Sequence, residues 1–296
     1  MLVPEVLDAT QKIEVVVFLH GHTEGTHRPF AGWRALVMPK PGDPNPLRQG
    51  IDAGDVAPVR DVALDQAPQQ LEESKQTQTV IVLPPGGLHS QFGRGDGKVG
   101  GFDFDSASYV NEIVSRLFTE RVWRDAKKQV VQKAPDVGRV TMAGHSGAGS
   151  TLRRMAQSST LTADLVLFDA INSADQLTAF KEWARRRLNQ DLAVLKNTKK
   201  TDAEKRAYLR TAQKLRSYAS GGDYKTRNVE LEKAITKWFA EHANELGPFE
   251  AALRANFVTK NIAVGHEELM RGAKAGSARG NAGHILDALR GLRASP

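Results

Sequence analysis

Ser146 is the residue whose type and surroundings best suit nucleophilic chemistry. It stands in the motif Gly144-His-Ser-Gly-Ala148, directly after the apolar run Val137–Ala143 and before a helical pattern. A serine at a sharp turn from a strand into a helix exposes its hydroxyl at a sheet edge, and the strained turn requires small residues on both sides. Gly144 and Ala148 meet that requirement, although this motif usually ends in glycine. The pattern predicts a serine nucleophile, with a glycine-rich turn that does no chemistry as the alternative.

A second motif lies upstream, where the apolar run Ile13–Leu19 is followed by His20-Gly21-His22. Together the two motifs resemble the α/β-hydrolase superfamily. The resemblance implies an oxyanion hole built from the backbone amide of Gly147 and from that of His22, with Thr23 as the neighbouring possibility. Two such donors stabilise the negative charge that develops on the carbonyl oxygen during acyl transfer. A His-Gly turn that serves only packing is the alternative interpretation.

The resemblance also implies the chain order serine, acid, histidine. Among the later histidines, His284 is the favoured general base, because it lies in a loop of small residues that leads into an amphipathic helix. His266, which directly follows the last predicted strand, is the rival. His145 is too constrained by its place next to the serine, and His242 lies on a polar helical surface.

The acid must hold the imidazole in the correct tautomer. Asp169 is the candidate, because it ends the apolar run that starts at Asp164 and would lie at the sheet edge where such folds carry their sites. In most of the superfamily the acid follows the next strand along the chain, and Asp175 is therefore kept as the alternative. A helix N-cap is the structural role that either aspartate could have instead.

The elements that must position these side chains are predicted by short runs rich in valine, isoleucine and leucine, without alternation. The runs are Ile13–Leu19, Val80–Leu83, Val137–Ala143, Leu165–Phe168 and Phe257–Val264. Such runs are typical of strands buried on both faces, and their spacing is too long for hairpins. Helical patterns between them, the clearest of which begins at Ser106, predict parallel strands joined by helices. The expected fold is α/β, with a mostly parallel central sheet flanked by helices.

The expected domain organisation is an α/β-hydrolase core, residues 1–172 and 257–296, interrupted by a helical and basic cap at residues 173–256. The cap carries Arg185-Arg-Arg187 and Lys199-Lys200. These cations could attract an anionic substrate, although a solvated helix face is the simpler interpretation.

The composition limits the remaining possibilities. The 296 residues include no cysteine, which excludes disulfides and thiolate chemistry, and the formal net charge is +7. Neither a signal peptide nor an apolar segment of about 20 residues is visible, so we expect a cytoplasmic protein, export by another route, or an excised domain. Asp96, Asp103 and Asp105 lack the full pattern of a calcium loop, and no metal and no cofactor are expected.

The sequence therefore predicts a serine hydrolase that cleaves a carboxylic ester through an acyl-enzyme, with the triad Ser146, His284 and Asp169. An amide or peptide bond is the alternative substrate. A non-catalytic binding module of the same fold is the alternative function. The expected partner is a small or polymeric acyl substrate, which the basic charge allows to be anionic, and neither nucleic acid nor a membrane span is expected.

Overall fold

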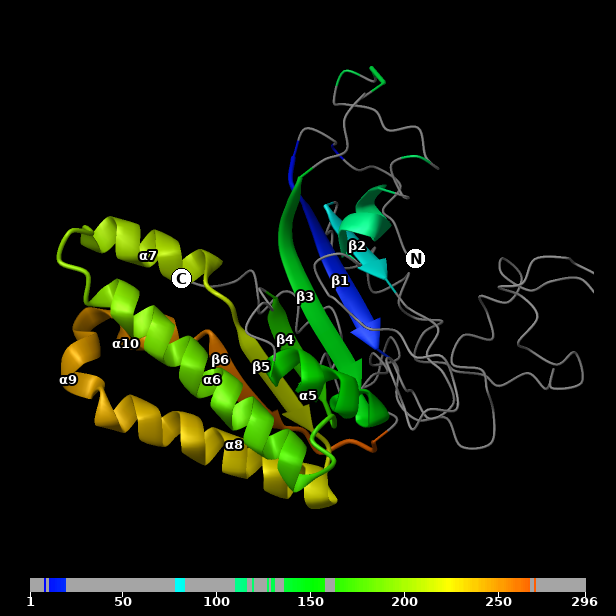
Figure 1. Cartoon of the computed structure of the whole chain (residues 1–296). Helices are drawn as coiled ribbons and strands as arrows, with labels where there is room; N and C mark the ends of the chain where they lie inside the picture. The colour runs from blue at the N-terminus through cyan, green and yellow to red at the C-terminus, as the bar shows by residue number, and fades with distance from the viewer. Residues whose placement is uncertain are drawn as a thin grey trace, which may run out of the picture.

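The computed structural model describes residues 11–19, 78–82, 110–115, 136–157 and 163–266, together with the single positions 8, 119, 127, 129, 130 and 269. Within this part, six parallel strands form one sheet in the order β2-β1-β3-β4-β5-β6 (Figure 1). The strands are β1 (Ile13–Leu19), β2 (Thr79–Val82), β3 (Val137–His145), β4 (Asp164–Phe168), β5 (Leu215–Ala219) and β6 (Phe257–Asn261). The predicted α/β fold with a parallel sheet is confirmed.

The helices follow the strands in alternation. They are α5 (Gly149–Gln157), α6 (Ala174–Leu195), α7 (Asp202–Thr211), α8 (Gly222–Glu241), α9 (Ala243–Leu246) and α10 (Glu250–Arg254), with 3₁₀ turns at Ser146–Ala148 (η5) and Gly247–Phe249 (η6). Residues 110–115 are also helical, as the pattern that begins at Ser106 predicts. Polar caps fix two helix starts: Ser173 accepts a hydrogen bond from the Gln176 amide, and Thr201 forms a capping box with Glu204.

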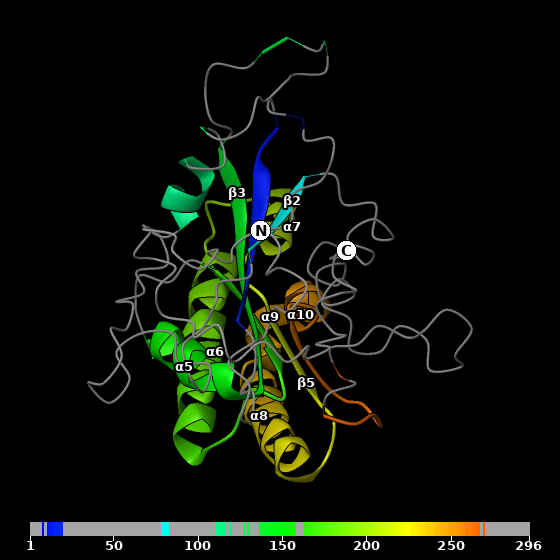
Figure 2. The ribbon, with the colours of Figure 1, turned by 90° about the vertical axis from the view of Figure 1, so that its right-hand side faces the viewer.

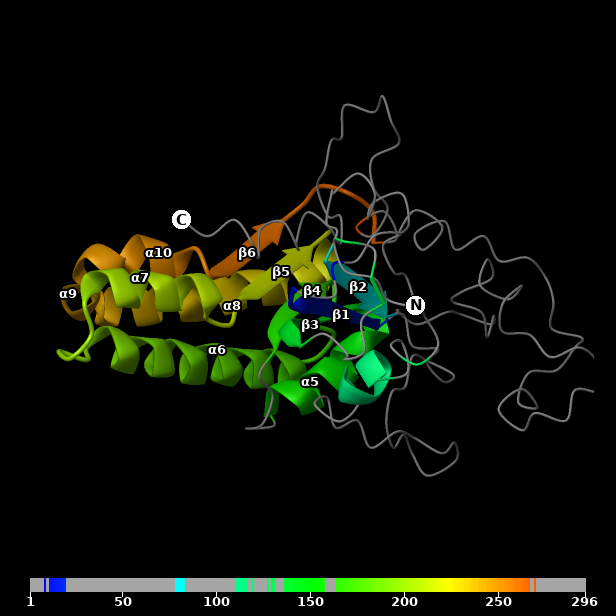
Figure 3. The same ribbon diagram turned by 90° about the horizontal axis from the view of Figure 1, so that it is seen from above.

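Burial of both faces of the sheet explains why the apolar runs form strands. Alternate residues of β1, among them Val15 and Val17, point into one apolar cluster with Leu165 and Leu167 of β4. Helices α5, α6 and α8 cover this face with residues such as Leu152, Phe180 and Leu231. Helices α6 and α8 lie side by side in two views (Figures 1 and 3), and Figure 2 places α5 and α6 on one side of β1 and β3. The intervening residues of β1, Val16 and Phe18, face the other way and are buried too, which accounts for the absence of alternation.

Strand β1 lies between β2 and β3, so the chain first adds a strand on one side of β1 and then continues on the other. In open parallel sheets, ligands bind beyond the carboxyl ends of the strands at such a reversal. Leu19, the last residue of β1, pairs with Gly144 of β3. The topology therefore places the segment after β3, which contains Ser146, at the position where a site is expected.

The segment 173–256 differs from the predicted helical cap, because it contributes β5 to the sheet between β4 and β6. Its helices α6 and α8 pack on the same apolar cluster as the rest of the core. We missed β5 because the run Leu215-Arg-Ser-Tyr-Ala219 contains an arginine and a serine, although all five residues are buried. Backbone pairing on both sides and the stacking of Tyr218 on Phe168, at 5.3 Å between ring centroids, hold this polar run in the sheet.

No helix in the described ranges combines the length and the apolarity that crossing a membrane requires.

Candidate active site

Ser146 lies at the turn from β3 into η5 and α5, as the motif predicts. Its φ is +50°, in the left-handed region that residues other than glycine rarely adopt, and only 8% of its surface is exposed. The side-chain amide of Asn172 donates to the Ser146 carbonyl at 2.6 Å, which holds the turn from outside the motif. Backbone strain of this kind is costly and collects at functional sites.

The small residues around Ser146 are required by close packing. A Cβ on Gly144 would lie 2.8 Å from the Cβ of Ala148 and 2.9 Å from Leu152 Cδ1. A Cβ on Gly149 would lie 1.9 Å from the carbonyl oxygen of Ala170. The glycine that the usual motif has at its last position is replaced by Ala148, whose Cβ fits because it faces Gly144.

Replacing Gly149 by alanine tests this packing. We expect Gly149→Ala to lower the free energy of unfolding by about 3 kcal/mol or more, because the added methyl group meets a backbone carbonyl that cannot move alone. The measurement is urea denaturation followed by circular dichroism. Gly221→Ala is the matched control: its φ is −172° and its Cβ would have no neighbour within 4 Å, so we expect a loss below about 1 kcal/mol. Equal losses in the two variants would contradict the tight approach at Gly149.

Asp169 directly follows β4, in the same way that Ser146 directly follows the neighbouring strand β3. His145 of β3 pairs with Phe168 of β4, so the next residue on each strand, Ser146 and Asp169, lies at the same edge of the sheet. Asp169 also has a positive φ, +46°, and its side chain is completely buried. Among the described residues, Ser146 and Asp169 are the two non-glycine residues with positive φ.

The carboxylate of Asp169 is held by the residue after β5 and by the segment after β6. Ser220 donates to it twice, from its backbone amide to Oδ1 at 2.8 Å and from its hydroxyl to Oδ2 at 2.5 Å. Nδ1 of His266 lies 2.8 Å from the same Oδ2. Because a carboxylate only accepts, Nδ1 carries the proton, and in the neutral imidazole Nε2 is left with the lone pair that a general base needs. The side chain of His266 is 31% exposed, so it stays accessible from outside.

Four adjacent strands thus contribute one residue each beyond their carboxyl ends, namely Ser146, Asp169, Ser220 and His266. The order of serine, acid and histidine along the chain is the one that the resemblance implies. The ring of His145, the residue before Ser146, lies 4.4 Å from the ring of His266 between centroids. The Asp169–His266 pair therefore lies close to the serine turn.

Of the two candidate acids, the geometry favours Asp169 over Asp175. The side chain of Asp175 is 82% exposed in the first turn of α6, where it forms an ion pair with Arg153 at 3.6 Å. The N-cap of α6 is Ser173, so Asp175 does not have that role either. His242 lies at the end of α8, where its Nδ1 contacts the carbonyl of Trp238 at 2.8 Å and its ring stacks on the indole.

Several sequence predictions fall outside the described residues. They concern His22 and Thr23 of the expected oxyanion hole, the favoured base His284, and the aspartates Asp96, Asp103 and Asp105.

Sequence reasoning missed Ser220 and Asn172. We interpreted Ser220-Gly-Gly as a break in a helical cap, because β5 before it was not recognised. Asn172 had no motif around it. A search for short polar residues directly after each strand would have found Ser220, provided β5 had been identified first.

A metal ion could be held in this region by His145, Asp169 and His266, whose donor atoms lie within 4.8 Å of one another. A zinc ion keeps its nitrogen and oxygen ligands at about 2.0–2.2 Å. Oδ2 of Asp169 already contacts both Ser220 and His266, so an ion there would have to replace hydrogen bonds that are now formed. In its present arrangement the cluster fits a hydrogen-bonded acid and imidazole better than a chelate.

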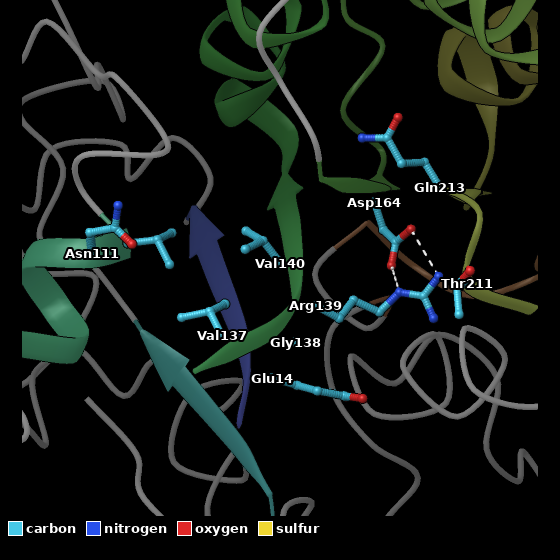
Figure 4. Close-up of a pocket in the computed structure, with 10 residues that line it drawn as sticks. Glu14, Asn111, Val137, Gly138, Arg139, Val140, Asp164, Thr211 and Gln213 are labelled. Atoms are coloured by element: carbon cyan, nitrogen blue, oxygen red, sulfur yellow. Dashed lines mark hydrogen bonds and ion pairs between the residues drawn. The ribbon is translucent and has the colours of Figure 1, made fainter. Parts of the chain in front are cut away.

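A cavity of about 470 Å³ lies at the opposite edge, near the amino ends of β1, β3 and β4 (Figure 4). The Arg139 guanidinium points at the buried carboxylate of Asp164, with Nε 2.5 Å from Oδ2. Burial raises the pKa of Asp164, although Arg139 opposes the shift, and burial also lowers the pKa of nearby Lys214 to about 8. The Lys214 backbone amide donates to Asp164 at 2.7 Å. These charged groups lie near the amino ends of β3 and β4 and directly before β5, at the end of the strands opposite to Ser146.

No protein-family model, curated protein or solved structure matches this chain.

Proposed function

We propose that the chain is a serine hydrolase of the α/β-hydrolase type, with Ser146 as nucleophile, His266 as general base and Asp169 as the acid. The observation that carries the proposal is the hydrogen bond between His266 Nδ1 and the buried carboxylate of Asp169, on the strand next to the strained Ser146. The base proposed here is the rival of the one favoured from sequence. His266 is chosen because it is paired with the acid candidate.

In this mechanism, Nε2 of His266 removes the hydroxyl proton of Ser146 as Oγ attacks the carbonyl carbon of an ester. Asp169 fixes the imidazole tautomer and stabilises the imidazolium that forms. The imidazolium then gives its proton to the leaving alcohol as the bond from the carbonyl carbon to the alcohol oxygen breaks. Water, activated by the same imidazole, attacks the acyl-enzyme and releases the carboxylic acid product and free Ser146.

The oxyanion is held by the backbone amide of Gly147 and, as the resemblance implies, by that of His22. Support for Gly147 comes from its place in η5, at the start of the helical turn that continues into α5. The first amides of a helix lack an acceptor within it, and the helix dipole favours negative charge there.

The basic segment gives little support to an anionic substrate. Arg187 is bonded to the fully buried Asp191 at 2.6 Å and to the hydroxyl of Tyr208 at 2.6 Å. Arg186 donates to the carbonyl of Ala156. Two of the three consecutive arginines therefore have structural contacts, which favours the interpretation of this run as part of the packing of α6.

Labelling with a fluorophosphonate probe tests the proposal. We expect the folded full-length chain to take up one probe per molecule, with the adduct mapped to Ser146 by peptide mass spectrometry, and heat-denatured chain to take up none. Absence of the adduct over a range of pH, in protein shown to be folded by circular dichroism, would refute the hydrolase proposal. An adduct confined to another serine would refute the assignment of Ser146.

The substrate class is tested by comparing a p-nitrophenyl ester with the p-nitroanilide of the same acyl group. We propose a carboxylic ester hydrolase and expect turnover of the ester with little turnover of the anilide. Comparable kcat/KM values for both substrates would instead indicate an amidase.

A further inference from the structure

The imidazole of His266 lies against two other aromatic rings. The ring of His145 is 4.4 Å away between centroids and inclined by 32°, and the ring of Tyr224 is 4.9 Å away and inclined by only 9°. His145 is the last residue of β3, and Tyr224 lies in the first turn of α8. The imidazole is thus in contact with two elements besides its own segment.

His145 also holds the backbone of His266. Its Nε2 lies 3.2 Å from the His266 carbonyl oxygen. A carbonyl only accepts, so Nε2 is the donor in this bond. His145 is 7% exposed, and its strand pairs with β1 and β4. The residue before the proposed nucleophile therefore fixes both the ring and the main chain of the proposed base.

Tyr224 contributes mainly its ring. A stacked aromatic ring packs against the face of the imidazole and restricts its tilt. Asp169 contacts the edge of the imidazole through Nδ1, whereas Tyr224 is nearly parallel to its plane. The hydrogen bond to Asp169 therefore restricts rotation of the imidazole within its plane, and stacking on Tyr224 restricts tilting out of that plane.

We propose that His145 and Tyr224 are positioning residues that clamp His266 in the orientation needed to remove the proton of Ser146. This inference rests on the proposed hydrolase function. A catalytic group must be held within about 0.5 Å and 10–20° of its productive geometry, and a displacement of about 1 Å can cost about 100-fold in rate.

Substitutions of His145 and Tyr224 test the clamp, because they remove the aromatic ring and the hydrogen-bond donor in different combinations. We expect His145→Leu, which removes the donor, to lower kcat for a p-nitrophenyl ester about 100-fold with little change in KM. His145→Gln keeps an N–H donor and is expected to recover part of this loss. Tyr224→Leu should lower kcat about tenfold, whereas Tyr224→Phe keeps the ring and should stay within about twofold of the native value.

His242→Leu is the matched control. His242 also stacks on an aromatic ring and contacts a backbone carbonyl, but it lies at the far end of α8, about 27 Å from Tyr224 along the helix axis. We expect this variant to lose some stability and to keep the native kcat. A loss of kcat in His242→Leu equal to that in His145→Leu would overturn the clamp, because the effect would then follow from destabilisation alone.

A spectroscopic measurement separates failure of the clamp from failure of the hydrolase proposal. The proton between His266 Nδ1 and Asp169 should give a low-field ¹H NMR resonance, which can be followed in Ser146→Ala protein without any activity. We expect His145→Leu and Tyr224→Leu to broaden or abolish this resonance, and His242→Leu to keep it. An unchanged resonance in both clamp variants would overturn the inference, whether or not the chain reacts with the fluorophosphonate.

Discussion

Replacement of Ser146 by alanine is expected to lower kcat for a p-nitrophenyl ester by about 10⁶-fold and to abolish the fluorophosphonate adduct, with little change in KM. The magnitude is that found when the nucleophile of a serine triad is removed, because the remaining groups cannot form an acyl-enzyme. Binding should persist, since Oγ contributes to the transition state rather than to recognition of the substrate. Steady-state kinetics and intact-mass spectrometry measure the two effects.

The controls for this prediction are a substitution of a nearby serine in α5 and a second substitution of Ser146. Ser150→Ala removes a nearby hydroxyl that accepts a hydrogen bond from Gln176 at 3.1 Å, and we expect it to keep the adduct at Ser146. Ser146→Gly is a second inactive variant, in which the positive φ costs less than it does for alanine. Ester turnover that survives in both Ser146 variants would show that the nucleophile lies elsewhere.

Replacement of His266 by alanine is expected to lower kcat/KM for the same ester by about 10⁶-fold, similar to removal of the serine, because the residues of a triad act as one unit. His284→Ala should change it less than about threefold. This expectation reverses the choice made from sequence, and it depends on the 2.8 Å contact between His266 and Asp169.

His242→Ala is the control for loss of a histidine elsewhere, since His242 contacts Trp238 at the end of α8. All three histidine variants should keep their far-ultraviolet circular dichroism spectra. The opposite ranking, with His284→Ala inactive and His266→Ala active, would restore the base favoured from sequence and remove His266 from the mechanism.

The strands that surround the serine could be predicted from sequence because their two faces are both apolar. The predicted runs at β1, β2, β3, β4 and β6 overlap the observed strands, and for β1 the bounds coincide. Strand β5 could not be recognised in this way. Its place depends on backbone pairing with β4 and β6, and Arg216 is buried within it with Nη1 bonded to the carbonyl of Leu215.

The partners of Ser146 could be predicted only in part. Asp169 could be selected because it directly follows an apolar run, and this position alone places it at the same edge of the sheet as Ser146. Choosing between His266 and His284 requires knowing which segment returns to that edge. His266 is 97 residues from Asp169, and no local pattern encodes a contact over that distance. Ser220 was missed for a different reason, because the strand that it directly follows, β5, was not recognised.

The two positive φ angles, at Ser146 and Asp169, have a consequence for protein engineering. Both residues occupy a backbone conformation in which glycine costs less free energy than a residue with a Cβ atom. A library selected for thermal stability alone should therefore accumulate glycine at position 146, which would remove the proposed nucleophile. Asp169 should be retained in such a library, because three hydrogen bonds hold its buried carboxylate. Any stabilisation of this chain should hold both positions fixed and seek its gains elsewhere.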